Sequence, residues 1–459
     1  MRAAPSRPRT AFHGAAEVTL LALVLAAPLT LSDLQAAAAR ADPRVLSALA
    51  DVEHMRGLSD EADAARWPVI SYLAVGGAPV PQYTNDPNHL DNVDAGSRLG
   101  NYQLGNWGFL VHGNVTLALP VFTFGKIAAY RAAAAKGVEA TGALADAARA
   151  QAAHDAAVAF WGYQLARAVL LGMDAADGQL AEARARVAQL LAAHSPQVTR
   201  SDLDKVDLVR AELRSKKSEA THGLALALDA GRLLTNTAPG APIAFAEAKL
   251  EPAPVKLVAP ERYGDAAVAN RPEVVAARAA LVARGELALE KHRELLPDVL
   301  VVGLADGSYS NAATRQTNPF AYDPYNGRTA GAGVAVRGNL DVFKVAARAR
   351  QADADRDKAF ADTQLAEKGV RLQAAMAVSA LGIAVDRAAA MQDESVSARR
   401  WATSAQLAFD AGTGEASDVL FAALAYARAS AEVLTASRDA EVALADLRLA
   451  IGTDPAELR

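Results

Sequence analysis

The sequence predicts a mainly α-helical protein with a β-barrel portion, in which long coiled-coil helices accompany four barrel strands and the arrangement is internally duplicated. Three observations predict this fold class. Aromatic residues make up only 5% of the 459 residues, and alanine dominates the apolar remainder. Two proline-free stretches, residues 123–193 and 344–411, are each long enough for a helix of roughly 100 Å. The same series of motifs also occurs twice along the chain.

The composition favours closely packed helices, because alanine is both the strongest helix former and a small residue. The net charge of −5 and the absence of a block rich in lysine and arginine argue against a nucleic-acid partner. The chain contains no cysteine, which excludes disulfides, thiol catalysis and zinc–thiolate sites. No His-Glu-x-x-His or Gly-x-Ser-x-Gly motif occurs, so we expect no enzyme, no metal site and no cofactor.

The N-terminus is typical of a secretory signal. Arg2, Arg7 and Arg9 precede an apolar run over residues 18–31, which is too short to span a bilayer. We therefore expect residues 1–27 to be a signal peptide; the alternative is that the run begins the first helix inside the protein. No other apolar segment of the sequence approaches the length of a transmembrane helix. Any insertion into a membrane would therefore have to use strands.

The duplication divides the chain. Pro43 and Pro272 occupy the same place in two similar helical motifs, and Pro68 and Pro297 precede two similar strand-like motifs. The number of residues between the two prolines is the same in both pairs. These matches predict a first repeat over residues 28–235, a proline-rich linker over 236–262 and a second repeat over 263–459. Each repeat is expected to contain a helix, two strands, a very long helix, a tip and a returning helix.

The four expected strands are residues 68–77, 106–119, 299–308 and 332–340. Most alternate in polarity; in the second, Val111, Val115 and Leu117 share one face, while His112 and Asn114 lie on the other. Strands of about 10 alternating residues, joined by the long polar loops 81–103 and 311–328, are typical of outer-membrane barrels. An antiparallel sheet in a soluble protein alternates in the same way, so this alternative stays open.

Two tips are expected where the long helices reverse. In "FDAGTGEASDV", Gly412 and Gly414 would form the reversal, and Ser417 and Asp418 would cap the next helix. In the first repeat, Pro196 ends the long helix, and Thr199 with Asp202 matches a capping box. Capping alone is one sufficient interpretation of both aspartates.

Together these motifs resemble the TolC-type outer-membrane efflux proteins. The resemblance rests on "LTLSDLQAAAARADPRV", "ERYGDAAVANRPEVVAARAALV", "LALPVFTFGKI" and "AGTGEASDVLFAALAYARASAEVLTA", in the family's order and over residues 31–454. It implies a homotrimer in the lipid of the bacterial outer membrane. The three chains would close one barrel with their strands, and the helices would extend through the periplasm as a tube.

The implied function is that of an outer-membrane channel in a tripartite efflux or type I secretion system, which forms a passive trans-periplasmic duct for export. Its implied partners are a second and third copy of the chain, a periplasmic adaptor protein and an inner-membrane pump of the RND or ABC type. The alternative is a soluble periplasmic coiled-coil scaffold protein without channel activity.

The resemblance also assigns residues at the tips. Those that would contact the adaptor are Val198, Thr199, Ser201, Gly412, Thr413 and Gly414.

For the gate, Asp418 matches an aspartate that rings the narrowest point in the family, and Phe421 stands where the family has a second aspartate. Asp202 matches an aspartate that latches the closed state, but its partners, a tyrosine and an arginine, align with Phe409 and Gly414. The sequence therefore predicts a cation-preferring, weakly latched entrance, in which Gly414→Arg would restore a charge pair.

Overall fold

A computed structural model describes residues 28–77, 108–195, 198–251, 259–311 and 325–457. These residues form two compact units: one contains the described residues up to Glu53 together with 140–278 and those from Asp362 onward, and the other contains 54–139 and 279–361. The expected signal peptide, the first two residues of the second expected strand, Pro196 and most of both polar loops lie outside the described residues.

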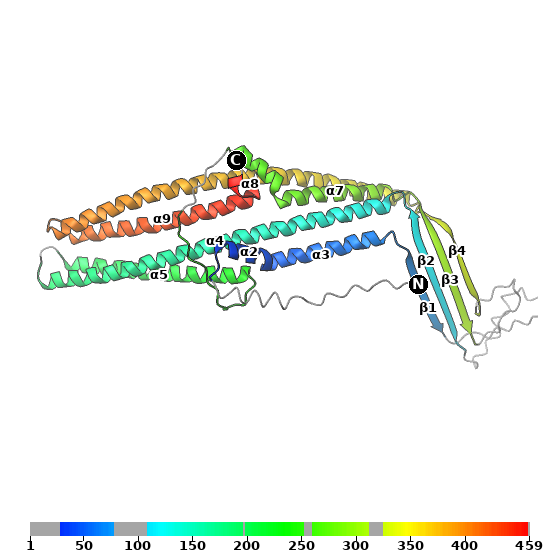
Figure 1. Cartoon of the computed structure of the whole chain (residues 1–459), viewed down its shortest axis with the longest axis horizontal. Coiled ribbons are helices and arrows are strands. Elements are labelled where there is room, and N and C mark those ends of the chain that lie inside the picture. Colours follow the sequence, from blue (N-terminus) through cyan, green and yellow to red (C-terminus); the bar gives the residue numbers. More distant parts are fainter. Residues whose placement is uncertain (1–27, 78–107, 196–197, 252–258, 312–324, 458–459) are drawn as a thin grey trace, which may run out of the picture. The chain divides into compact units, whose positions relative to one another are not determined.

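The elements follow the same order twice (Figure 1). The first series is α2 (Leu31–Ala41), α3 (Pro43–Ala64), β1 (Val69–Gly77), β2 (Leu110–Phe122), α4 (Lys126–Ala192) and α5 (Arg200–Leu234). The second is α6 (Pro260–Asn270), α7 (Pro272–His292), β3 (Asp298–Ser310), β4 (Arg328–Arg337), α8 (Val342–Asp410) and α9 (Ala416–Ile451), followed by a short 3₁₀ turn at Pro455–Glu457. The predicted duplication and the two very long helices, of 67 and 69 residues, are confirmed.

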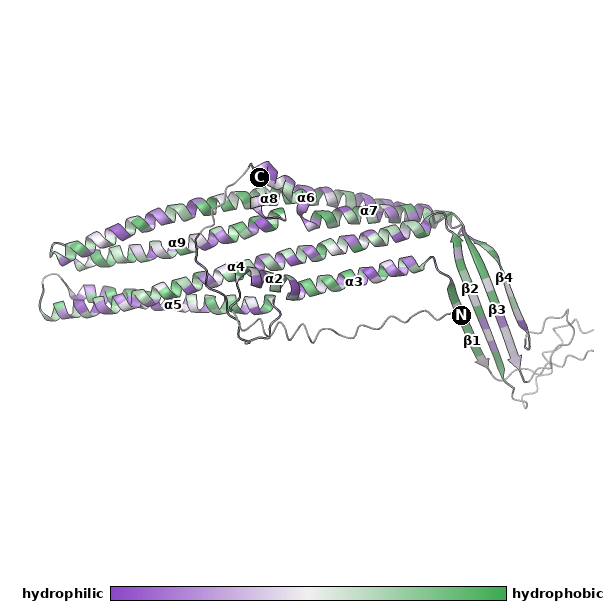
Figure 2. Ribbon diagram, viewed as in Figure 1, coloured by the Kyte–Doolittle hydropathy of each residue, from purple (hydrophilic) through white to green (hydrophobic). Residues whose placement is uncertain are grey.

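The strands form one antiparallel sheet in the order β1-β2-β3-β4. Its register gathers the polar side chains on one face: Ser71 pairs with Thr116, Leu73 with Asn114, and Asn114 with Asp306. The opposite face is apolar and consists of Ile70, Tyr72, Val111, Val115, Leu117, Leu119, Val299, Val301, Tyr309, Val334 and Val336, with glycine and alanine between them. Figure 2 shows the resulting mixture of apolar and polar segments along each strand.

All four strands differ from their expected bounds, β1 and β3 by one or two residues at an end and β2 and β4 by more. β4 begins at Arg328, inside the predicted loop, and ends at Arg337, three residues before Leu340, because Asp341 already begins the approach to α8. β2 continues past Leu119 to Phe122 through an irregularity between Pro120 and Phe122, where proline lacks the N–H that a regular ladder needs. Only the register shows which face of β3 is apolar, because residues 299–305 are apolar on both sides.

The helical unit has two apolar cores, in which alanine lies among larger side chains. The first surrounds Phe160 and Phe245, with α2, the middle of α4 and the end of α5 around them. The second surrounds Tyr263 and Leu447, with α6, α8 and α9. Small side chains allow close approach here: a Cβ on Gly231 would lie 2.6 Å from the Phe245 ring.

The expectation that no helix reaches transmembrane length and polarity was wrong. Among the described helices, α4, α8 and α9 each contain an 18-residue window that is apolar enough to cross a membrane by length and composition. The reason is alanine, which raises the hydropathy of a helix without giving it a bulky apolar surface. Parts of the windows in α4, α8 and α9 are buried inside the protein.

Candidate functional site: the helical tips and a buried polar network

The second tip, residues 411–415, ends α8 with a Schellman motif. Gly412 has a φ of +78°, the left-handed conformation that glycine adopts at low cost. The Thr413 N–H donates to the Ala408 carbonyl and the Gly412 N–H to the Phe409 carbonyl, both at 3.0 Å. The expected role of Gly412 in reversing the chain is confirmed by this geometry.

Gly414 is required for a different reason. A Cβ at this position would lie 2.9 Å from the Phe409 backbone nitrogen and 3.1 Å from the Ala408 carbonyl carbon. Any side chain there would meet the last turn of α8. The expectation that Gly414→Arg would restore a charge pair is therefore wrong for this backbone, because the substitution would first displace the tip.

The restart of α9 does not use the expected caps. Glu415, not Ser417, is the N-cap residue, and the Ser417 hydroxyl donates to the Glu415 carboxylate at 3.2 Å. Asp418 lies in the first turn, where a carboxylate suits the positive end of the helix. Its side chain is exposed and forms no hydrogen bond or ion pair with a described residue. Capping therefore does not account for Asp418.

The first tip, before α5, does contain the expected capping box between Thr199 and Asp202. The Thr199 backbone N–H and hydroxyl both donate to Asp202 Oδ2, at 2.9 and 2.7 Å. Lys205 Nζ donates to the other oxygen, Asp202 Oδ1, at 3.1 Å. Val198, expected at the adaptor surface, is only 5% exposed, as is typical of the residue before an N-cap that packs on the following turn. Leu203, in that turn, is also buried.

These contacts occupy both oxygens of Asp202. Burial raises the pKa of its carboxyl, but the hydrogen bonds from Thr199 and Lys205 outweigh burial and leave the pKa below its ordinary value. Asp202 is thus an ionised part of its own helix cap. Phe421 is more than half exposed and Phe409 is half-buried at the other tip.

Two ion pairs that the sequence analysis missed join the helical hairpins. Arg186 on α4 lies 3.5 Å from Asp410 at the end of α8, and Arg428 on α9 lies 3.8 Å from Glu212 on α5. All four side chains are largely exposed, so each pair contributes little to stability. No sequence motif marks them, because their partners are more than two hundred residues apart.

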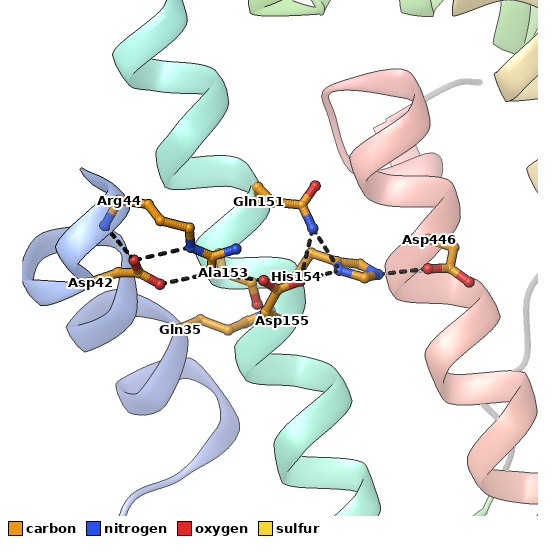
Figure 3. A network of polar contacts seen from close by, with 8 residues as sticks. All are labelled: Gln35, Asp42, Arg44, Gln151, Ala153, His154, Asp155 and Asp446. Atoms are coloured by element: carbon orange, nitrogen blue, oxygen red, sulfur yellow. Dashed lines mark hydrogen bonds and ion pairs between the residues drawn. The ribbon is translucent and has the colours of Figure 1, made fainter. Parts of the chain in front are cut away.

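A polar network links α2, α3, α4 and α9 (Figure 3). Asp42, with a side chain only 2% exposed, accepts from the Arg44 backbone N–H and guanidinium at 2.7 Å each. Arg44 also lies 2.8 Å from Asp155 on α4. His154 approaches Asp155 through Nδ1 and contacts Asp446 of α9 through Nε2 at 2.6 Å. The sequence signal was present in Asp42-Pro43-Arg44, an N-cap acid before proline, but it gave no indication of partners on α4 and α9.

The network keeps Asp42 and Asp155 charged. Burial raises the pKa of Asp42, but its hydrogen bonds with Arg44 outweigh burial and lower the pKa. Burial also raises the pKa of Asp155, and hydrogen bonds from His154, Arg44 and Gln151 lower it further than burial raises it. A buried acid that receives several charge-assisted bonds ties its elements together firmly.

The second repeat has a similar ion pair between its two short helices, with the charges exchanged. The first repeat has Asp42-Pro43-Arg44, whereas in the second Arg271 precedes Pro272 and Glu273 follows it. The Arg271 guanidinium lies 2.7 Å from Glu273 and also bonds Gln373 on α8. Each repeat therefore fixes the angle between its two short helices with one ion pair around a proline and one contact to its long helix.

Comparison with solved structures identifies this architecture. A membrane protein from Pseudomonas aeruginosa superposes with a TM-score of 0.75 over 92% of each chain at 20% identity. The outer membrane protein VceC from Vibrio cholerae gives 0.72 over 92% of this chain and 96% of its own, at 17% identity. The open state of the MtrE outer membrane channel from Neisseria gonorrhoeae gives 0.72 over 92% and 89%, at 16% identity.

The chain has the fold of an outer-membrane channel. The channels OprN, CusC and CmeC share it as well, which confirms the fold expected from the resemblance to TolC-type proteins. No family model and no curated protein matches the sequence. In this channel fold, Asp418 lies at the second tip without a partner among the described residues, and the polar network lies where α2 and α3 meet the long helices.

Proposed function

We propose that the protein is a channel of the bacterial outer membrane, with its helices extending into the periplasm. The observation that supports this proposal most directly is the sheet. One face is apolar and exposed, and the other carries the polar residues, as in a barrel that faces lipid outside and water inside. Tyr72, Val334 and Val336 on the apolar face are each at least 70% exposed within the chain.

Aromatic pairs bound the apolar face at both ends. At one end the rings of Phe109 and Tyr309 are 5.8 Å apart, and at the other those of Phe122 and Phe124 are 4.7 Å apart. From Val111 to Phe122 the strand rises by about 36 Å, which a barrel tilt of roughly 40° reduces to about 28 Å. This height and the two aromatic girdles match the hydrocarbon core of a membrane.

The membrane-crossing windows of α4, α8 and α9 fit this role less well. Each of these helices is longer than a bilayer requires, and their apolar residues contribute to the two cores of the helical unit. The alternative function, a soluble periplasmic scaffold, leaves the exposed apolar sheet without a partner. Large exposed apolar surfaces are rare on soluble monomers.

Closure of the sheet supports a homotrimer. β1 and β4 each pair on one side only among the described strands, so the sheet has two open edges. Open edges do not occur in hydrocarbon, where every backbone N–H and C=O needs a partner. Four strands cannot close a barrel, whereas three chains would supply twelve, within the range of bacterial barrels.

The tips support the finer part of the proposal, a passive duct in a tripartite efflux or type I secretion system. Thr199, Ser201 and Thr413 are exposed around the two reversals and would contact a periplasmic adaptor protein, with an RND or ABC pump in the inner membrane beyond it. Gly412 and Gly414 shape this surface, and buried Val198 supports it from inside. Asp418 would give the entrance its cation preference, as acidic rings do in cation channels.

The sheet gives a direct test with a matched control. Val115 and Thr116 are neighbours in β2 on opposite faces, and Thr116 has no acid opposite it. Val115→Asp would place a charge against lipid and prevent insertion into planar bilayers, whereas Thr116→Asp would face water and insert like the wild type.

Wild-type protein should produce stepwise conductance and have the mass of three chains in mild detergent. Recovery of the wild type from the soluble periplasmic fraction without detergent would instead support the scaffold.

A further inference from the structure

Each edge of the sheet has an aromatic residue beside a cation at the end that joins the helices. On the β1 edge, Arg66 precedes Trp67, and the guanidinium carbon lies 5.7 Å from the centre of the indole ring. On the β4 edge, Phe343 precedes Lys344 in the first turn of α8. Trp67 is 62% exposed and Phe343 90%, so both rings point away from the packed helices.

The two cations have no acidic partner within the described part of the chain. Neither Arg66 nor Lys344 forms an ion pair with a described residue. Lys126, which holds the position of Lys344 in the first repeat, is different: it is 15% exposed, lies 2.8 Å from Asp298 and donates to the Leu296 carbonyl at 2.7 Å. Lys126 therefore holds the sheet to α4, whereas Lys344 has no such structural role.

The nearest acid does not neutralise Lys344. Asp341 lies three residues earlier and accepts a hydrogen bond from the Lys344 backbone N–H at 3.4 Å. This contact caps the start of α8 and leaves the ammonium group unpaired by any described residue. A positive charge beside an exposed ring thus remains on each edge, at the end of the sheet that joins the helices.

We propose that Arg66–Trp67 and Phe343–Lys344 bind the phosphate of an anionic phospholipid in the inner leaflet of the outer membrane. This rests on the proposed barrel. When the sheet closes, β1 of one chain pairs with β4 of the next, which brings Arg66–Trp67 beside Phe343–Lys344 of the partner chain. Each boundary between chains then carries one complete site, and a single chain carries only its two halves.

A lipid phosphate fits better than a free phosphate because the site is apolar as well as charged. Trp67 and Phe343 favour the boundary between headgroups and acyl chains, where aromatic residues gather. The apolar face begins directly beyond, at Ile70 and Val336, and would accommodate the acyl chains of the same lipid. Cations near an anionic membrane surface attract its lipids by about fivefold for each charge.

The test measures the lipid shell of the assembled protein. Wild-type trimers are reconstituted in phosphatidylcholine vesicles containing trace spin-labelled phosphatidylglycerol or spin-labelled phosphatidylcholine with the same chains. The fraction of motionally restricted label gives the relative association of the two lipids. Because each site has two cations, we expect a preference for phosphatidylglycerol of up to about 25-fold at 0.1 M salt, and we expect it to fall toward one in Arg66→Gln/Lys344→Gln.

Lys358→Gln is the matched control. Lys358 is an exposed lysine on the same helix, about 21 Å further along it at 1.5 Å per residue, and so lies beyond the headgroups. This variant should keep the wild-type preference. Equal association of both lipids with wild-type trimers, or a preference that survives the double substitution, would overturn the lipid site while leaving the channel intact. Failure of the wild type to enter vesicles at all would instead reject the channel itself, and the lipid site with it.

Discussion

His154 Nε2 lies 2.6 Å from Asp446 Oδ1 and joins α4 of the first repeat to α9 of the second. We expect Asp446→Ala to lower the free energy of unfolding by about 1 kcal/mol, because it removes one bond to a largely buried imidazole. Glu219→Ala, which removes an exposed pair with Lys216, should change it by less than about 0.5 kcal/mol. Denaturant titration followed by circular dichroism measures the free energy of unfolding of both variants. Equal losses would show that the His154–Asp446 contact stabilises the protein no more than an exposed ion pair does.

Arg44 should matter more than its own exposure suggests, because its partner Asp42 is buried. Arg44→Gln leaves that carboxylate without its guanidinium, and we expect a loss of about 3 kcal/mol. Arg149→Gln is the control, since Arg149 pairs with Asp146 on the exposed side of α4. The unfolding midpoint should fall clearly for Arg44→Gln and hardly for Arg149→Gln. A small effect of Arg44→Gln would mean that Asp42 is stabilised mainly by backbone N–H groups.

The lowered pKa of Asp155 predicts an acid-dependent contribution to stability. Its folded pKa is below the unfolded value of about 3.9, so its stabilising effect is complete above that value and is lost as the pH falls through the folded pKa. The difference in stability between wild type and Asp155→Asn should therefore shrink as the pH falls from about 5 toward 3. Unfolding midpoints at each pH measure this difference. If this stability difference instead widened between pH 5 and pH 3, the direction assigned to the pKa shift of Asp155 would be wrong.

The sequence predicted features that depend on local chemistry. Gly412 at a helix reversal and the Thr199–Asp202 cap are local motifs, and both are present. The network of Asp42 and Asp446 was missed because it depends on which distant helix faces become neighbours. The faces of β3 were ambiguous for the same reason: only pairing with β2 and β4 shows that Val301 lies on the apolar side.

Gly414 gives a test of the tip backbone. Gly414→Ala would force a Cβ to within 2.9 Å of the Phe409 nitrogen, so the last turn of α8 must shift. We expect faster hydrogen exchange at the amides of Thr413 and residue 414, which both donate to the Ala408 carbonyl. Gly178→Ala, where a Cβ meets nothing within 4 Å, should leave the tip unchanged and stabilise α4 by up to about 1 kcal/mol. Unchanged exchange in Gly414→Ala would show that the reversal tolerates a side chain.

We expect the two tip aspartates to have different roles: Asp418 supplies a charge at the channel entrance, and Asp202 caps a helix. Asp418 is exposed and unpaired among the described residues, so Asp418→Ala should remove cation preference and move the reversal potential toward zero under a salt gradient. Both carboxylate oxygens of Asp202 accept hydrogen bonds, from Thr199 and Lys205. Asp202→Asn should therefore lower the free energy of unfolding by about 1 kcal/mol and leave the reversal potential near the wild-type value. Single-channel recordings in planar bilayers measure both variants. If Asp418→Ala conducts with the wild-type reversal potential, Asp418 serves only to complement the positive end of α9.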